Sequence, residues 1–447
     1  MILVPALLAA VAVSFVACNA GTATGGIDTS FAGTGFAITS FGTGDDEAFA
    51  VAVQSDGKIV AAGRVTDATG GKDFGIARYL SDGTIDTAFG GTGQVTLDFS
   101  LGLDEVRAVA IQTDGRMVVA GTTTSGTVSR VALARFLTDG TADTSFGGGG
   151  KVSVALGAAG DTGRGVAIQS DGKILVSGTT VVGANNAFLL ARYNADGSPD
   201  TTFNLGASFR SFALGNGNDQ GTGMSLLRTG ATVVSGSARF GPVNHTRFAV
   251  AKFTSTGTVD TTFGLSGFNA VNFGSNPGTG ADTQIVASND IANAIATLSD
   301  GSLILAGTSN DGTSDRFGVA KYAANGELDS TFGTAGLVIV SFGPGNAAGR
   351  AAAVLSDRAL YVAGNFNGTS NGTSTRALAV ARLSATGTVD RSFGSNGIVL
   401  TEFYRSGTQV GTGQANAMAI QTDGKVLVAG YAAAVSGGQD FVIVRYR

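Results

Sequence analysis

ARYLSDGTIDTAFG, residues 77–90, is a fourteen-residue stretch that the chain repeats at a nearly constant interval. ARFLTDGTADTSFG follows at 134–147 and ARYNADGSPDTTFN at 191–204. Its closing element, Asp-x-x-Phe, occurs seven times at intervals of 57–69 residues, beginning at Asp28, Asp86, Asp143, Asp200, Asp260, Asp329 and Asp390. A fixed period of this length indicates a structural unit used repeatedly.

One unit divides into four short strands, near residues 94–99, 106–112, 117–121 and 131–136, which are joined by tight turns. Four strands per unit are typical of a β-propeller blade. The sequence therefore predicts an all-β, seven-bladed β-propeller spanning residues 28–447 as one domain. Its channel would be lined by innermost strands near 48–54, 106–112, 163–169, 222–227, 292–298, 349–355 and 415–421.

The two ends of the repeat array predict how the ring closes. The array begins with an outer-type strand, Phe36 to Phe41, and ends on a third-strand sequence, DFVIVRYR. The last blade therefore lacks an outer strand that the first residues can supply. Pairing them would satisfy backbone groups that otherwise form exposed edges.

The repeated hairpin places opposite charges eight residues apart. A three-residue Ser-Asp-Gly loop pairs Leu80 with Thr84, so Arg78 falls opposite Asp86. We interpret the six such pairs as structural, worth about 0.2–1 kcal/mol each as cross-strand pairs, because an active site is not built six times. They are Arg78–Asp86, Arg135–Asp143, Arg192–Asp200, Lys252–Asp260, Lys321–Asp329 and Arg382–Asp390.

Units of 57–61 residues reading D-x-x-F-G, then A-x-A-[IV]-Q-x-D-G-K-[IL]-[VL]-V-x-G, then A-R-[YF]-x-x-D-G resemble the delta-60 repeat of bacterial secreted and surface proteins. The resemblance covers residues 28–447. It implies a β-propeller of unassigned function. Units four and six depart most, because LRTGAT and LSDRAL replace the Asp-Gly-Lys turn.

Composition excludes several kinds of site. The net charge is −5, which argues against nucleic acid. One Cys excludes an internal disulfide, and one His leaves almost no route to a zinc or copper site. No EF-hand spacing supports a calcium site. We therefore expect no cofactor, no metal and a monomer. His245, in a single variable loop, is interpreted as a surface residue.

The N-terminal residues 1–18 read as a signal peptide. FVAC, Phe15 to Cys18, resembles the bacterial lipobox, in which the Cys is lipidated and becomes the first residue. Phe15 stands where Leu is usual, and no Lys or Arg precedes the apolar core. The expectation is lipidation at Cys18, residues 19–27 as a tether, and a protein at the cell envelope or outside the cell. The membrane would be contacted only through the anchor. An ordinary signal peptide cut after Ala17 or Ala20 is the alternative.

The two ends of the blades differ in sequence variation. The Asp-Gly turns lie at one end, here called the Asp-Gly end, and vary little. The other end, the variable-loop end, carries the loops that differ between units, which is how binding surfaces are usually built. There the start of the innermost strand holds Arg107, Arg164, Asn293, Arg350 and Asn416, with Phe49 and Gly223 in the other units.

This position has two interpretations. Acids just before it, among them Asp46, Glu47, Asp104, Glu105, Asp161 and Asp290, would form salt bridges around the channel mouth. Alternatively, the converging Arg side chains would hold a polar ligand, for instance an anion. The longer loop of unit five, Gly274 to Asp290, would then act as a lid.

Three functions remain open, and the third of them is a purely mechanical role as a spacer. The first is a non-catalytic scaffold that binds an unknown protein or carbohydrate at its variable-loop end. The second is a propeller enzyme of the lactonase, glycosidase or quinone dehydrogenase kind. Such chemistry needs metal ligands, paired carboxylates or a His near the channel, and the scattered acids favour the scaffold.

Overall fold

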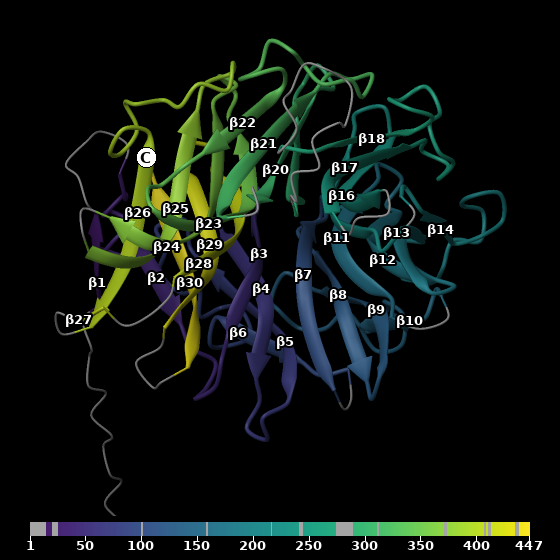
Figure 1. Ribbon diagram of the computed structural model, residues 1–447. Helices are drawn as coiled ribbons and strands as arrows, with labels where there is room; N and C mark the ends of the chain where they lie inside the picture. Colours follow the sequence, from purple (N-terminus) through teal and green to yellow (C-terminus); the bar gives the residue numbers. More distant parts are fainter. Residues whose placement is uncertain are drawn as a thin grey trace, which may run out of the picture.

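The computed structural model describes residues 15–19, 26–99, 102–157, 160–215, 217–240, 245–273, 289–310, 313–370, 373–405, 408–409, 413–433 and 438–447. Within these residues the strands form seven antiparallel four-stranded blades around one axis, as the sequence predicted (Figure 1). The described residues contain no helix with the length and apolar character needed to cross a membrane.

The blades follow the chain in order, each starting with its innermost strand. Blade 1 contains β3 (Glu47–Val53), β4 (Ile59–Thr66), β5 (Lys72–Tyr79) and β6 (Gln94–Leu97). Blade 2 contains β7 (Leu103–Ile111), β8 (Met117–Ser125), β9 (Val128–Phe136) and β10 (Lys151–Val154). Blade 3 contains β11 (Thr162–Ile168), β12 (Ile174–Val182), β13 (Asn185–Tyr193) and β14 (Phe209–Phe212).

The second half repeats this order. Blade 4 contains β15 (Gln220–Leu226), β16 (Thr232–Phe240), β17 (His245–Phe253) and β18 (Phe268–Val271). Blade 5 contains β19 (Ile291–Thr297), β20 (Leu303–Asn310), β21 (Asp315–Tyr322) and β22 (Leu337–Val340). Blade 6 contains β23 (Gly345–Val354), β24 (Leu360–Ser370), β25 (Thr373–Leu383) and β26 (Ile398–Arg405). Two further strands, β1 (Phe15–Asn19) and β27 (Thr408–Gln409), pair with β26.

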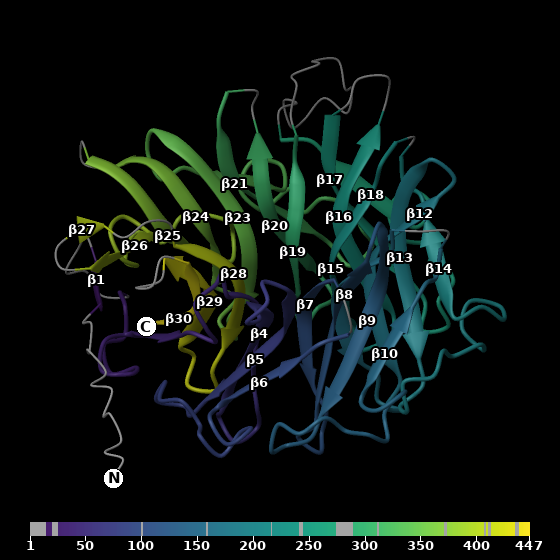
Figure 2. The ribbon, with the colours of Figure 1, turned by 90° about the horizontal axis from the view of Figure 1, so that it is seen from below.

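Blade 7 is built from both ends of the repeat array. Its first three strands are β28 (Gln414–Ile420), β29 (Val426–Ala433) and β30 (Gln439–Tyr446), and its outer strand is β2 (Phe36–Thr39). Phe36 pairs with Val444 and Thr39 with Phe441, which confirms the predicted closure. The purple and yellow segments that meet in both ribbon views are these strands (Figure 2).

The core lies between the blades. Seven clusters of buried side chains occupy the described structure, one for each pair of adjacent blades. The second strands are buried on both faces, as in Ile59 to Ala62, because each lies between two neighbouring sheets. Burial of these apolar surfaces, at roughly 25 cal/mol per Å², is the main force that joins the blades.

The six opposite-charge pairs all lie in contact, and a seventh joins Arg445 to Asp28 across the closure. We call these seven pairs the clamps. Their nitrogen-to-oxygen distances are 2.7–3.3 Å. Sequence spacing missed the seventh because its partners are separated by almost the whole chain.

The clamps explain why Asp-x-x-Phe recurs. In blade 1 the guanidinium of Arg78 donates to Asp86 and lies 4.6 Å from the ring centre of Phe89. One cation thus contacts both residues of the motif, by an ion pair and by cation–π attraction. The Phe ring also packs on the next blade, since a Cβ added to Gly140 would lie 2.8 Å from Phe89. In blade 1 the clamp therefore orders its own blade, and the Phe beside it contacts blade 2.

Candidate functional site

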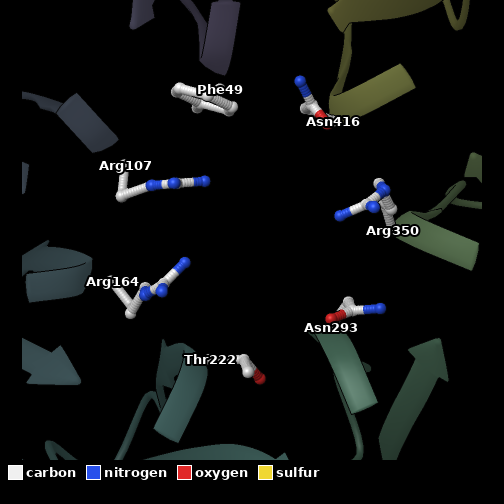
Figure 3. Close-up of a pocket in the computed structure, with 7 residues that line it drawn as sticks. All are labelled: Phe49, Arg107, Arg164, Thr222, Asn293, Arg350 and Asn416. Atoms are coloured by element: carbon white, nitrogen blue, oxygen red, sulfur yellow. The ribbon is translucent and has the colours of Figure 1, made fainter. Parts of the chain in front are cut away.

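Every innermost strand carries a β-bulge at the same place. The ladder to the second strand shifts after Ala48, Val106, Gly163, Gly221, Ala292, Gly349 and Ala415. The next residue in each strand has no partner, and a bulge of this kind re-aims a side chain. These seven residues line a cavity of about 120 Å³, and we call them the channel ring: Phe49, Arg107, Arg164, Thr222, Asn293, Arg350 and Asn416 (Figure 3).

A glycine in each second strand makes room for the bulge. Gly121 faces Val106, and a Cβ added to Gly121 would lie 1.9 Å from the carbonyl oxygen of Glu105. No side chain fits at that distance. The equivalent glycines are Gly63, Gly178, Gly236, Gly307, Gly364 and Gly430, with corresponding distances of 1.7–1.9 Å. The glycine that ends motifs such as RMVVAG and KILVSG therefore leaves room for the bulge, and the bulge directs the side chain of the ring residue into the channel.

The structure brings the five candidate ligand-binding residues together in this ring. Phe49 joins them, as expected, but Gly223 does not. Gly223 follows the bulge, and Thr222 occupies the ring position. Aligning Gly223-Met224 with Gly165-Val166 would have given Thr222 from the sequence.

Arg107 is held by groups of its own protein. Its Nε and Nη2 donate to the two carboxylate oxygens of Glu105 at 2.8 and 2.7 Å. Its guanidinium carbon also lies 3.9 Å from the ring centre of Phe49. Beside it, Arg64 donates to Glu47 at 2.7 Å. This part of the mouth thus has the salt bridges that the structural interpretation predicted.

The uncharged polar members of the ring tie neighbouring blades together. The Nδ2 of Asn293 donates to the carbonyl of Gly349 at 2.7 Å, and that of Asn416 donates to Ala48 at 2.9 Å. Thr222 donates in the same way to Ala292. Each acceptor is the residue just before the next bulge, so these side chains hold the ring together.

Arg164 and Arg350 differ from the other members of the ring. Among the described residues neither has a hydrogen bond or an ion pair, although both are half-buried. Burial, followed by repulsion from Arg107, lowers the pKa of Arg164 from 12.5 to about 10, so it stays charged at neutral pH. Burial also lowers the pKa of Arg350. In Figure 3 the two side chains extend toward the centre from opposite sides, and Arg107 points there too.

The buried aspartates near the mouth do not pair with these arginines. Asp161 accepts hydrogen bonds from the backbone N–H groups of Leu156 and Gly157 and from the Thr180 hydroxyl. Asp104 accepts bonds from the Phe99 N–H and the Thr123 hydroxyl. Asp46 and Asp290 make backbone bonds of the same kind. The expected salt bridges to the ring arginines are therefore not formed by Asp46, Asp104 and Asp161 in the described structure, because these carboxylates hold loops by hydrogen bonds instead.

One acidic group was not foreseen. Carboxylate oxygens of Asp73, Asp98 and Asp104 lie within 4.8 Å of one another at the junction of blades 1 and 2. Burial, followed by repulsion from Asp98, raises the pKa of Asp73 to about 6. Asp104 is already bound by its own hydrogen bonds. No sequence pattern indicated this group, because its members come from the ends of three different strands.

Two residues and one loop that were singled out in the sequence are not part of the channel ring. Cys18 falls in β1, whose backbone pairs with β26 opposite Glu402. His245 begins β17, at the variable-loop end of blade 4. The predicted lid from Gly274 to Asp290 lies outside the described residues except for its last two.

Comparisons with known proteins agree on the architecture. Residues 54–89, 112–146, 169–203, 230–263, 298–332, 355–393 and 421–447 match the family described as "Domain of unknown function (DUF5122) beta-propeller". No curated protein matches the sequence.

Similar solved structures include a protein of unknown function from Dyadobacter fermentans DSM 18053, at 13% identity, covering 92% of this chain and 97% of that one, with a TM-score of 0.45. The polysaccharide lyase Uly1 has 13% identity, 89% coverage of both chains and a TM-score of 0.48. A PL25 ulvan lyase has 10% identity, 95% coverage of both chains and a TM-score of 0.48.

Proposed function

We propose, from the premise that this chain belongs to the DUF5122 beta-propeller family, that it is a non-catalytic binding protein of the bacterial cell envelope. Its ligand carries an anionic group, which the channel ring holds at the variable-loop end of the channel. Arg164 and Arg350 bind that group from opposite sides, and Arg107 adds to the positive potential.

The observation that carries this proposal is a pair of half-buried guanidinium groups, Arg164 and Arg350, which have no hydrogen-bond or ion-pair partner among the described residues. A cation taken out of water costs free energy unless an opposite charge or hydrogen-bond acceptors compensate it. The chain has a net charge of −5 and ample acids, yet neighbouring carboxylates are bonded to other groups. An anion entering the ring would supply the missing acceptors, and Arg suits carboxylate and phosphate groups through its paired N–H donors.

The enzyme alternative has less support from the ring. A hydrolase or lyase needs a group free to move a proton. In the described structure Glu105 is bound by both nitrogens of Arg107, and Glu47 by Arg64. Arg, Asn, Thr and Phe side chains fit binding better than acid–base chemistry.

Isothermal titration calorimetry with sodium phosphate and sodium acetate tests the anion site. We expect saturable binding that weakens with added salt and at least a tenfold loss in Arg164→Met/Arg350→Met. Arg130→Met is the matched control, because Arg130 is exposed on β9 and outside the ring. Equal affinity in the double variant, or no binding of either anion, would overturn the proposal.

The cellular location of the protein is a separate part of the proposal. We propose diacylglyceryl modification of Cys18, the only Cys in the chain. Cys18→Ser should move the protein from the membrane fraction to the soluble fraction, and mass spectrometry of the wild type should find the lipid. A variant that stays with membranes, or an unmodified wild-type Cys18, would contradict it.

A further inference from the structure

The side chains that line the channel change from mostly polar to apolar just behind the channel ring. A second cavity, of about 260 Å³, is lined by the seven ring residues and by the two residues that follow each of them. Since the innermost strands run toward the Asp-Gly turns, this cavity lies on the Asp-Gly side of the ring. At about 3.3 Å per residue, its wall extends roughly 7 Å beyond the ring.

The side chains behind the ring are all apolar. The first residue of each following pair is Ala or Gly, and the second is half-buried and, in every blade except blade 6, larger than the first. The larger residues pack partly between blades and leave their remaining surface to the channel. They are Val51, Val109, Val166, Met224, Ile295 and Met418, with Ala352 in blade 6.

A polar, cationic ring therefore borders a chamber whose side chains are apolar. An inorganic anion would use only the ring, and a neutral hydrocarbon would leave Arg164 and Arg350 without acceptors. A ligand with one anionic head and an apolar chain complements both parts. The head must be small, because the ring encloses about 120 Å³, and a planar carboxylate matches guanidinium donors on two sides.

We propose that the channel binds a small aliphatic carboxylate. Its head lies between Arg164 and Arg350 (Figure 3). Its chain runs past the apolar side chains behind the ring toward the Asp-Gly end. This inference rests on the proposed anion site and adds the class of ligand. Ala352 leaves the widest part of the wall, where a chain has the most room.

Calorimetric titration of the full chain with acetate, butanoate and hexanoate tests the inference. Burial of each methylene should tighten binding about fourfold, so hexanoate should bind on the order of a hundredfold more tightly than acetate. Hexylamine, with the same chain and a cationic head, should not bind. Equal affinities along the series, or binding of hexylamine, would overturn the inference.

Variants of the wall separate this inference from the anion site. Ala352→Leu should fill the chamber, leave acetate affinity unchanged and reduce the hexanoate advantage at least tenfold. Val109→Thr/Val166→Thr, which keeps the side-chain shape, should reduce the same advantage severalfold even if Ala352→Leu fails to fold. Ile339→Thr on the exposed outer strand of blade 5 is the matched control.

The outcomes are distinguishable. If acetate and phosphate bind but chain length has no effect, the anion site stands and the carboxylate-chain inference fails. If no anion binds, both fail. If hexanoate binds equally well to Arg164→Met/Arg350→Met, the chamber binds hydrocarbon without the ring and the proposed anion site fails.

Discussion

The clamps and the channel ring are each built seven times from equivalent positions, yet they use sequence in opposite ways. Every clamp pairs a cation with the Asp of Asp-x-x-Phe. The channel ring repeats only its backbone, a bulge opposite a Gly, and carries Phe, Arg, Thr or Asn on it. Repetition of the side chain marks a structural task, whereas repetition of the backbone with varied side chains leaves room for recognition.

The clamps themselves differ around the ring. In blades 7, 1, 2 and 3 the Asp meets a second cation, from Lys425, Lys58, Arg116 and Lys173. The clamp Arg in each of these blades also donates to a backbone carbonyl of the next blade. Blades 4, 5 and 6 have Ala231, Ser302 and Ala359 in place of the second cation. The first four junctions are therefore fastened more strongly.

The largest effect should come from breaking the closure. Deleting residues 28–39 removes β2 and the Asp28 carboxylate, so β30 becomes an exposed edge and Arg445 is left buried without its partner. We expect the thermal midpoint to fall by more than about 10 °C. A peptide of residues 26–42 added to the truncated chain should restore part of the loss. An unchanged melting curve would refute the role of the closure.

The second-largest loss of stability should come from filling the space that a bulge needs. Gly121→Val places a side chain where the Glu105 carbonyl lies, so blade 2 must distort at a cost of roughly 4 kcal/mol or more. Urea unfolding measures it. The control is Gly148→Ala, which meets nothing within 4 Å and should change stability by less than about 0.5 kcal/mol. Equal effects of the two substitutions would show that the bulges do not depend on these glycines.

The two kinds of clamp should differ in strength. Arg135→Met leaves Asp143 buried with only Arg116 and should cost about 2–4 kcal/mol. Lys321→Met, in the more exposed clamp of blade 5, should cost about 1 kcal/mol. Urea midpoints of both variants measure the difference, and equal losses would contradict it.

The pH dependence of the Arg135 effect follows from Asp143. Hydrogen bonding by Ser145, with Arg135 adding to it, lowers the pKa of Asp143 from 3.8 to about 2. A lowered pKa in the folded state means that the clamp stabilises fully above pH 4. The loss in free energy of unfolding caused by Arg135→Met should therefore become smaller as the pH falls from 4 toward 2.

The smallest effect on stability should come from the channel ring. Arg164→Met/Arg350→Met removes two cations that have no partner within the described part of the chain. We therefore expect the free energy of unfolding to stay the same or to rise by up to about 1 kcal/mol. The clamp variants, measured beside it, should lose stability without losing ligand. A loss of more than about 2 kcal/mol in the ring variant would mean that these arginines are structural.

Most of the fold could be predicted from the sequence because each unit repeats the same order of strands and turns. The predicted innermost strand at 106–112 corresponds to β7, Leu103–Ile111, and the other six agree as closely. The clamp partners could be predicted where a hairpin fixes their spacing. Arg445 and Asp28 could not be paired this way, because no hairpin joins them and they lie at opposite ends of the repeat array.

The site was less accessible to sequence reasoning. Alternation along a strand does not reveal a bulge, so unit four was read one residue out of place, at Gly223 instead of Thr222. Which arginines have partners depends on the residues beside them in each blade, which the period of the repeat does not show. Arg107 and Arg164 occupy equivalent positions, but only Arg107 has a Glu two residues earlier; Arg164 has Thr162 there.

The shared blade 7 puts the sequence repeat and the structural blade out of phase by one strand. A repeat that starts at Asp-x-x-Phe holds the outer strand of one blade and the three inner strands of the next. The chain therefore crosses every junction between adjacent blades. Blade 7 differs in that its third and outer strands, β30 and β2, are paired without being consecutive in the chain. Joining the ends there and opening the chain before another outer strand would give a circular permutant with the same contacts. The position of the two ends of the repeat array therefore decides which blade is shared. The arrangement of the seven blades in the folded ring does not by itself distinguish a first blade.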